Sequence, residues 1–246
     1  MSEGEQIEKT TPEIPVEPET PSYKLILALG LAGLFSGLVI VGTYIYTLPI
    51  INKNKAEAQQ RAIFKVLPGC VSFTTLQLLN DQIVEKPQLP KGKTESDTEE
   101  IHEIFAGFNE EGNLIGFAIP GSESGFQDII GTIFGYDAAN ETIIGFEVLE
   151  SKETPGLGDK IFKDENFALN FKALAVMPEI IPAKPGQKTK PNEVETISGA
   201  TISSKAVVRL LNKAVALWYE PLKSIDTSIL VAPDTSVETD QSTDNE

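Results

Sequence analysis

The chain has 246 residues, 41% of them hydrophobic, which is enough for one ordinary domain with additional segments. Its formal net charge of -16 excludes a nucleic-acid-binding surface, because neutralising phosphates requires clustered Lys and Arg. A single cysteine, Cys70, excludes an intrachain disulfide and every multi-cysteine metal site.

Both ends of the chain have the composition of disordered segments. Residues 1–22 repeat Pro, Glu and Thr with few large apolar groups, and residues 226–246 are similarly polar and acidic. Such segments cannot bury enough apolar surface to offset the entropy lost on ordering. We therefore predict two disordered acidic tails.

The segment 23–51 is predicted to be a transmembrane helix. No residue after Lys24 in this segment is charged, and about 20 apolar residues suffice to cross a bilayer core. Gly30, Gly33 and Gly37 have a spacing that permits close packing of another helix, although glycine is also common in membrane helices generally. The apolar stretch is too long for a cleaved signal peptide.

Residues 52–225 are predicted to form a stalk helix and one folded domain. The stalk has apolar residues at helical spacing from Ala58 to Leu67 and ends at Pro68. Residues 80–100 are polar and Lys/Glu-rich, so we expect a surface excursion. Cys70 has no adjacent cation and is expected to be an inert thiol in an apolar pocket, and His102 is expected to be solvated.

Four short strands are predicted next, joined in pairs by polar turns. They cover Ile104–Phe108, Leu114–Ile119, Ile129–Tyr136 and Thr142–Leu149. Apolar residues alternate along two of them, which predicts one buried face on each strand. These residues are Ile115, Phe117 and Ile119, and Ile144, Phe146 and Val148.

Two helices are predicted after the strands. A short amphipathic helix is indicated by Phe167, Phe171 and Leu174, and a long helix closes the domain. The apolar residues of the long helix are Ile202, Ala206, Leu210, Ala214, Leu217 and Trp218, with a second row at Val207, Leu211 and Val215. A block of strands followed by helices predicts an α+β fold, an antiparallel sheet with flanking helices, preceded by one transmembrane helix.

The segment 198–204 has the composition of a ligand-binding turn before the long helix. Its small residues let the backbone approach a ligand closely, and the first helical turn offers unpaired N–H groups that suit a phosphate. An ordinary helix N-cap formed by Ser198 or Thr201 explains the same residues. The candidate cofactor-binding residues here are Ser198, Gly199, Ala200, Thr201, Ser203 and Ser204.

A second candidate segment directly follows the last predicted strand. Two glycines surround one leucine, an arrangement that permits positive dihedral angles and close contact with a planar ring. A tight turn into the next helix is the alternative. The candidate cofactor-binding residues here are Glu153, Thr154, Gly156, Leu157 and Gly158. Together the two segments supply what a ligand with a phosphate and a ring requires.

These two motifs behind an N-terminal membrane helix resemble the G subunit of the Rnf ion-translocating electron-transport complex. The chain is also similar to the C subunit of the sodium-pumping NADH:quinone oxidoreductase, which shares the FMN-binding domain. The resemblance covers roughly residues 23–222. It implies FMN joined through a phosphoester to Thr201, with Ser203 as the fallback acceptor. The acidic position that precedes the motif in this family falls on Glu195, where Asp is usual.

The resemblance also implies the partners and the function. A separate flavin transferase, using FAD and magnesium, would recognise the segment that includes Glu195 and attach the flavin. The mature chain would relay electrons beside other membrane subunits of an Rnf-type complex, without turning over a substrate itself. Lys184, Lys188 and Lys190 precede the motif and either favour the phosphate or form a solvated basic loop.

The side of the membrane is predicted differently by charge and by resemblance. Lys53, Lys55, Arg61 and Lys65 follow the span, which by the positive-inside rule would place the domain in the cytoplasm. The resemblance implies the extracytoplasmic side of a bacterial inner membrane, and we adopt that prediction because large domains translocate despite flanking charge. The rival functional hypothesis is a membrane-anchored interaction or assembly module that binds no flavin.

Overall fold

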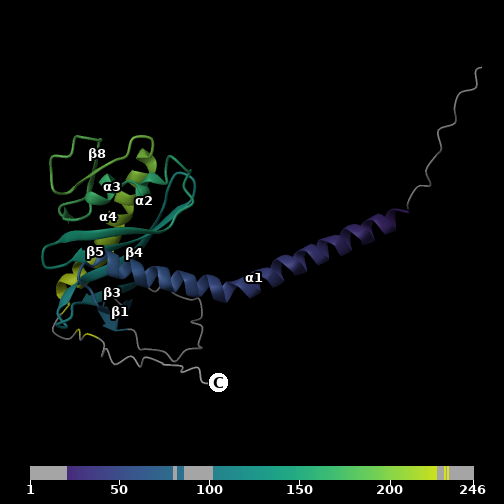
Figure 1. The fold of residues 1–246 in the computed structure, drawn as a ribbon, viewed down its shortest axis with the longest axis horizontal. Coiled ribbons are helices and arrows are strands. Elements are labelled where there is room, and N and C mark those ends of the chain that lie inside the picture. The colour runs from purple at the N-terminus through teal and green to yellow at the C-terminus, as the bar shows by residue number, and fades with distance from the viewer. Residues whose placement is uncertain (1–20, 80–81, 86–101, 226–229, 231, 233–246) are drawn as a thin grey trace, which may run out of the picture. The chain divides into compact units, whose positions relative to one another are not determined.

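The computed structural model describes residues 21–79, 82–85, 102–225, 230 and 232 (Figure 1). The chain divides into two units, Met1–Lys53 and Asn54–Glu246. Nearly all residues of the two predicted tails lie outside the described residues, as does most of the predicted excursion at 80–100.

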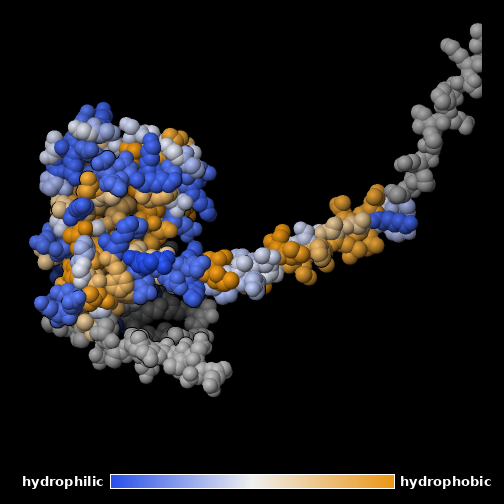
Figure 2. All heavy atoms as spheres, viewed as in Figure 1, coloured by the Kyte–Doolittle hydropathy of each residue, from blue (hydrophilic) through white to orange (hydrophobic). Residues whose placement is uncertain are grey.

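Helix α1 (Ser22–Val66) continues without interruption through Pro49. In the first unit its large apolar side chains are exposed, and Figure 2 shows this stretch as a mainly hydrophobic surface. Among the described residues, α1 is the one helix long and apolar enough to cross a membrane. The predicted boundary between span and stalk, after Ile51, stays a prediction, because α1 is continuous across it.

The second unit is built on a seven-stranded sheet in which all neighbouring strands are antiparallel. The spatial order is β2-β1-β3-β4-β5-β6-β7. The strands are β1 (Ser72–Leu79), β2 (Gln82–Glu85), β3 (Glu103–Phe108), β4 (Leu114–Ser124), β5 (Ile129–Asp137), β6 (Thr142–Glu150) and β7 (Leu174–Ala175). The predicted α+β class and the four predicted strands, β3 to β6, are confirmed.

Opposite faces of the sheet are covered by different helices (Figure 1). Two adjacent residues of β5 show the division. Phe134 belongs to the apolar cluster shared with α4 (Thr201–Ser224), whereas Ile133 belongs to the cluster shared with the end of α1. The end of α1 approaches the sheet so closely that a Cβ atom at Gly135 or Gly145 would collide with the Val66 carbonyl. Glycine in these strands is therefore required by helix packing.

The predicted burial pattern of β6 is wrong at Ile144. Gly135 pairs with Gly145 and Tyr136 pairs with Ile143, so Ile144 is an extra residue in a β-bulge. The bulge shifts the alternation of side chains. Ile144 consequently packs against the cluster beneath α1, whereas Phe146 packs against the cluster beneath α4.

The short amphipathic helix is divided into α2 (Lys160–Lys163) and α3 (Glu165–Leu169). The predicted members Phe171 and Leu174 lie beyond the helix end, and Leu174 begins β7. Phe171 still packs in the core, stacked on Phe146 with ring centroids 4.4 Å apart. Two further strands, β8 (Ile181–Ala183) and β9 (Glu193–Glu195), form a separate parallel pair.

Helix α4 buries most of the predicted apolar residues but not all of them. Ile202 is 52% exposed and Leu217 is 37% exposed, although both belong to the apolar pattern that predicted this helix. Leu210 and Trp218 are buried as expected. The buried face of α4 is narrower than the apolar residues in the sequence indicate, which leaves two apolar side chains accessible on this helix.

The surroundings of Cys70 agree with the predicted inert thiol. The Cys70 thiol donates a hydrogen bond to the Ser72 carbonyl at 3.2 Å, and burial raises its pKa despite that bond and one from Phe108, which favours the unreactive protonated form. His102 is exposed, as expected.

Candidate functional site

The two predicted motifs lie against each other although they are far apart in the sequence. The Ser203 hydroxyl on α4 donates a hydrogen bond of 2.5 Å to Oε2 of Glu153, which follows β6. Both side chains are buried, with 1% and 5% of their surface exposed. The first turn of α4 is thereby fixed to the segment that contains the two motif glycines.

Glu153 also binds a third segment, which the sequence motifs did not include. Its Oε1 accepts hydrogen bonds from the backbone N–H groups of Phe126, at 2.9 Å, and Gln127, at 3.0 Å. A side chain at Gly125 would collide with the same carboxylate. The sequence signal that could have identified this segment is Gly125 followed by Phe126 and Gln127, because a residue without a side chain lets the next two backbone N–H groups approach the carboxylate.

The environment of Glu153 keeps its carboxyl ionised. Burial is the largest single influence and raises the pKa, but the Ser203 hydroxyl and the surrounding backbone N–H groups together lower the pKa below its ordinary value. Both carboxylate oxygens are occupied by protein donors. Glu153 therefore connects the segments of the site instead of presenting a free carboxylate to a ligand.

The loop after β6 presents one apolar side chain between two glycines. Gly158 is buried, and a Cβ atom there would collide with the Glu153 carboxylate. Gly156 has a φ of +79° with open space around it, so glycine is favoured there by the backbone conformation and not by lack of space for a side chain. Leu157 is 49% exposed, and the Thr154 hydroxyl donates to the Gln127 side-chain oxygen at 2.8 Å.

The start of α4 does not contain the predicted side-chain N-cap. Ala200 occupies the N-cap position and makes no side-chain capping bond. Ser204, one turn later, accepts from the Ile197 N–H at 3.1 Å and donates to the Ala200 carbonyl at 2.9 Å. The N-cap explanation for Ser198 and Thr201 is therefore wrong, and neither hydroxyl is used to close the helix end.

The hydroxyl groups of the motif divide into two accessible and two buried ones. Ser198 and Thr201 are exposed, whereas Ser203 and Ser204 are buried and hydrogen-bonded. Thr201 is the first residue of α4, and its hydroxyl makes one long contact of 3.4 Å with the Ile197 carbonyl. Because it is buried, the fallback residue Ser203 is poorly placed to accept a flavin phosphoryl group.

The surroundings of Thr201 fit a ligand with a phosphate and a planar ring. The 24-residue helix α4 has no acidic residue in its first turn, so its N-terminus can favour an anion. Exposed Leu157 lies beside Gly199, where a Cβ atom would be 3.5 Å from Leu157 Cδ2. Ile202 adds a second exposed apolar side chain next to Thr201.

Glu195 and the basic loop lie on the β8–β9 side of the motif. Glu195 is half-buried in β9, where its Oε1 accepts from the Lys188 N–H at 3.3 Å and its own N–H donates to Asn170 Oδ1 at 3.0 Å. Lys184, Lys188 and Lys190 are all exposed. Lys188 Nζ donates to Asn170 Oδ1 at 3.4 Å, so Asn170 joins this loop to β9.

The conformation of Gly156 gives a direct test of the loop. We expect Gly156→Ala to lower the free energy of unfolding by about 1 kcal/mol, because an L-residue at this φ is strained although no atom obstructs its side chain. Gly131→Ala is the control, since that position has no positive φ and only ordinary contacts. Urea unfolding followed by tryptophan fluorescence measures both changes, and equal values for the two variants would contradict this explanation.

Comparison with known proteins defines the class of the domain. Residues 125–216 match the FMN-binding domain family, a range that contains Gly125 and both motifs. The fold is similar to solved structures of NqrC from Shewanella oneidensis (TM-score 0.54, 16% identity) and of the C subunit of Na(+)-translocating NADH-quinone reductase from Parabacteroides distasonis (TM-score 0.56, 20% identity). These alignments cover 71% and 72% of this chain and 100% and 97% of the others. The chain therefore carries an FMN-binding domain.

Curated relatives define the particular family. The G subunit of the ion-translocating oxidoreductase complex from Salmonella typhi is 30% identical, with 69% of this chain and 77% of the relative aligned. The protein of the same name from Methanosarcina acetivorans is 29% identical, with 78% and 92% aligned. The chain belongs to the family of G subunits of ion-translocating oxidoreductase complexes, as the resemblance in the sequence predicted.

Proposed function

We propose that this protein is the membrane-anchored flavoprotein subunit of an Rnf-type ion-translocating ferredoxin/NAD oxidoreductase complex, with FMN held covalently on Thr201. Family membership and the FMN-binding domain support the flavoprotein assignment. A relative from Acetobacterium woodii, 26% identical, is the G subunit of the Na(+)-translocating ferredoxin:NAD(+) oxidoreductase complex. The candidate membrane span supports the anchor.

The accessibility of Thr201 is the observation that carries the covalent assignment. Of the four hydroxyl side chains from Ser198 to Ser204, the two buried ones already hydrogen-bond within the protein. Thr201 is exposed at the N-terminus of α4, where a phosphoryl group on its oxygen would lie beside unpaired backbone N–H groups. Ser198 is also exposed but precedes the helix.

Attachment requires a partner enzyme and a defined exchange of bonds. Transfer from FAD forms a bond between the Thr201 oxygen and the FMN phosphorus, breaks the pyrophosphate bond of FAD and releases AMP. No general base contacts Thr201 in the described structure, where its hydroxyl contacts only the Ile197 carbonyl. The flavin transferase would therefore accept the hydroxyl proton and supply the magnesium, and Glu195 would belong to the segment that it recognises.

The remaining site residues would hold the cofactor in position. FMN supplies the electron-transfer chemistry when bound, and the protein fixes its position and potential. Leu157 and the backbone of Gly156 and Gly158 would contact the ring, while Glu153 and Ser203 hold that loop against α4. Covalent attachment would prevent loss of the cofactor outside the cytoplasm, where we place the domain of a single-pass protein next to other membrane subunits.

The intact mass of the protein tests the proposal. Full-length protein co-produced with a flavin transferase should gain the mass of one phosphoester-linked FMN, and fragmentation of the peptide 198–205 should place it on Thr201. Protein made without the transferase is the control and should weigh only its amino acids. An unmodified mass in the presence of an active transferase would favour the rival hypothesis, an anchored module without covalent flavin.

A further inference from the structure

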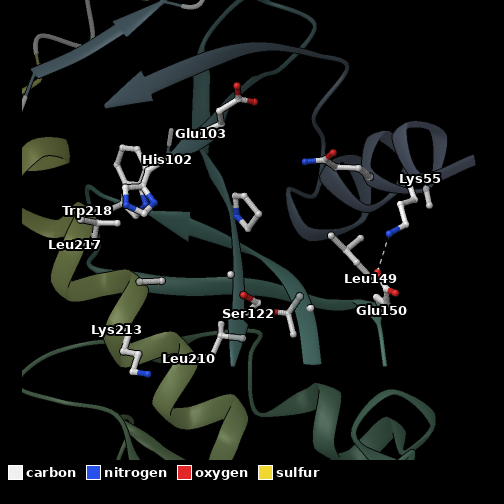
Figure 3. Close-up of a pocket in the computed structure, with 17 residues that line it drawn as sticks. Lys55, His102, Glu103, Ser122, Leu149, Glu150, Leu210, Lys213, Leu217 and Trp218 are labelled. Atoms are coloured by element: carbon white, nitrogen blue, oxygen red, sulfur yellow. Dashed lines mark hydrogen bonds and ion pairs between the residues drawn. The ribbon is translucent and has the colours of Figure 1, made fainter. Parts of the chain in front are cut away.

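A cavity lies beside the point where the pairing of strands β3 and β4 ends, away from the proposed FMN site (Figure 3). The pairing of β3 with β4 ends at Phe105 and Ala118, whereas β4 stays paired with β5 as far as Ser124. The cavity of about 1020 Å³ lies beside this free stretch of β4, between the Asn54-to-Val66 part of α1 and helix α4. None of the residues from 151 to 159 or from 197 to 204 lines it.

The interior of the cavity is mainly apolar. Its walls include Ala58 of α1, Leu149 of β6 and Leu210, Ala214, Leu217 and Trp218 of α4. The wall residue Leu217 is 37% exposed. A concave apolar surface of this volume is typical of a site for a small hydrophobic or amphipathic ligand.

One buried polar group in the cavity wall lacks a partner. Thr132 is 1% exposed, and its Oγ1 has no hydrogen-bond partner among the described residues. Neighbouring Gly131 also lines the cavity, although it has no positive φ, and a Cβ there would lie 3.6 Å from Glu150 Cβ, an ordinary contact. A larger residue at position 131 would occupy cavity space, whereas glycine leaves that space free next to the Thr132 hydroxyl.

Charged pairs border the cavity on both helices. Lys55 Nζ lies 3.1 Å from Glu150 Oε2 at one side, and Lys213 Nζ lies 2.5 Å from Glu123 Oε2 at the other. Figure 3 shows Lys55 and Lys213 on opposite sides, with Ser122 of β4 between them. Both lysine side chains are largely exposed and each is paired with a carboxylate, so the rim can bind a polar head group while the interior holds an apolar chain.

The sequence indicates which amphiphile is available. Lys55 is the fourth residue after Ile51, where the predicted span ends, so the connecting chain can extend at most about 14 Å. Membrane lipids are therefore the amphiphiles within reach of this part of the chain.

We propose that this cavity binds one long-chain acyl amphiphile, either a membrane phospholipid or a free fatty acid. The acyl chain would lie against Leu210, Ala214 and Trp218, and an oxygen of its ester or carboxyl group would accept a hydrogen bond from the Thr132 hydroxyl. The head group of a phospholipid would lie at the lysine-bordered rim. The site is separate from the proposed flavin position, and the membrane anchor is the only part of the proposed function on which it rests.

The single tryptophan of the chain gives a direct measurement, because Trp218 lines the cavity. Full-length Thr201→Ala protein, used so that no attached flavin absorbs the emission, is placed in phospholipid vesicles, which contain no other tryptophan. One arm compares phospholipids brominated in their acyl chains with unbrominated ones, and the other titrates brominated stearic acid into unbrominated vesicles. Quenching of Trp218 by at least half in the first arm identifies phospholipid, and saturable quenching only in the second identifies free fatty acid.

Two variants separate the cavity from nonspecific contact. Ala214→Phe should fill the cavity and reduce quenching at least fivefold, whereas Ala216→Phe, exposed on the same helix and outside the cavity, should leave it unchanged. Thr132→Val preserves the side-chain shape and should weaken binding roughly fivefold, as expected for one lost hydrogen bond. The proposal is overturned if neither arm quenches Trp218, or if the folded Ala214→Phe or Thr132→Val protein is quenched like the parent.

Discussion

Thr201→Ala protein, co-produced with a flavin transferase, should give no fluorescent band under ultraviolet light after denaturing electrophoresis. The wild-type band should be bright, because a phosphoester survives denaturation whereas a noncovalent flavin is lost. Removing the hydroxyl removes the only accessible oxygen on the first turn of α4, since Ser203 and Ser204 are buried. The expected effect is complete loss of the covalent flavin, with the fold retained because Thr201 is exposed.

Three companion variants make this result specific. Thr201→Ser keeps an oxygen at the same place and should retain a measurable band, whereas Ser198→Ala should be as bright as the wild type. Ser203→Ala should also keep the band while lowering stability, because it removes the hydrogen bond to Glu153. A bright Thr201→Ala band, or loss of fluorescence in Ser198→Ala alone, would move the attachment point away from Thr201.

Glu153→Gln should lower the free energy of unfolding by about 2–3 kcal/mol at neutral pH, because hydrogen bonds to a charged acceptor are replaced by weaker ones. The amide can accept from Phe126 and Gln127 with its oxygen, but its NH₂ group then faces the Ser203 hydroxyl in place of an acceptor. Urea unfolding of the full-length protein, followed by Trp218 fluorescence, measures the difference. Glu150→Gln, at an exposed ion pair, is the control and should change stability by less than about 1 kcal/mol.

The stabilisation that Glu153 contributes to the fold should decrease as the pH falls. Its pKa in the folded protein is lowered from the ordinary value of 4.5, so the ionised group stabilises the fold above about pH 4.5. That stabilisation is lost as the pH falls through the lower folded-state pKa. The stability difference between wild type and Glu153→Gln should therefore be constant near neutrality and shrink below pH 4.5, and a difference that grows on acidification would contradict the assignment.

The sequence was most informative where a pattern is local. Strands β3 to β6 follow each other through short polar turns, and their alternation and turn residues were sufficient to predict them. The turn at Asn109 illustrates this, because its side chain accepts from the N–H groups of Glu111 and Asn113. Family membership was likewise predictable, since two motifs in a fixed order are more specific than either alone.

Features that depend on contacts between distant segments were not predictable in the same way. Strand β1 was missed although Pro68 and Gly69 mark a turn before it, because its residues do not alternate strongly and it is stabilised by pairing with β3 and β2. The bulge at Ile144 and the exposure of Ile202 depend on how β6 and α4 pack. Glu153 was correctly selected as a site residue, but its hydrogen bonds to Phe126, Gln127 and Ser203 required the three-dimensional structure.

The hydrogen bond between Glu153 and Ser203 has a consequence for the order of folding. The hairpins β3–β4, β4–β5 and β5–β6 each close a short loop, whereas this bond joins residues 50 positions apart. The entropy cost of closure rises with the logarithm of the separation, so local pairing is favoured early and the docking of α4 late. A newly synthesised chain would thus possess much of its sheet before the threonine of α4 reaches its final surroundings, and flavin added in that interval would meet an unfinished binding surface.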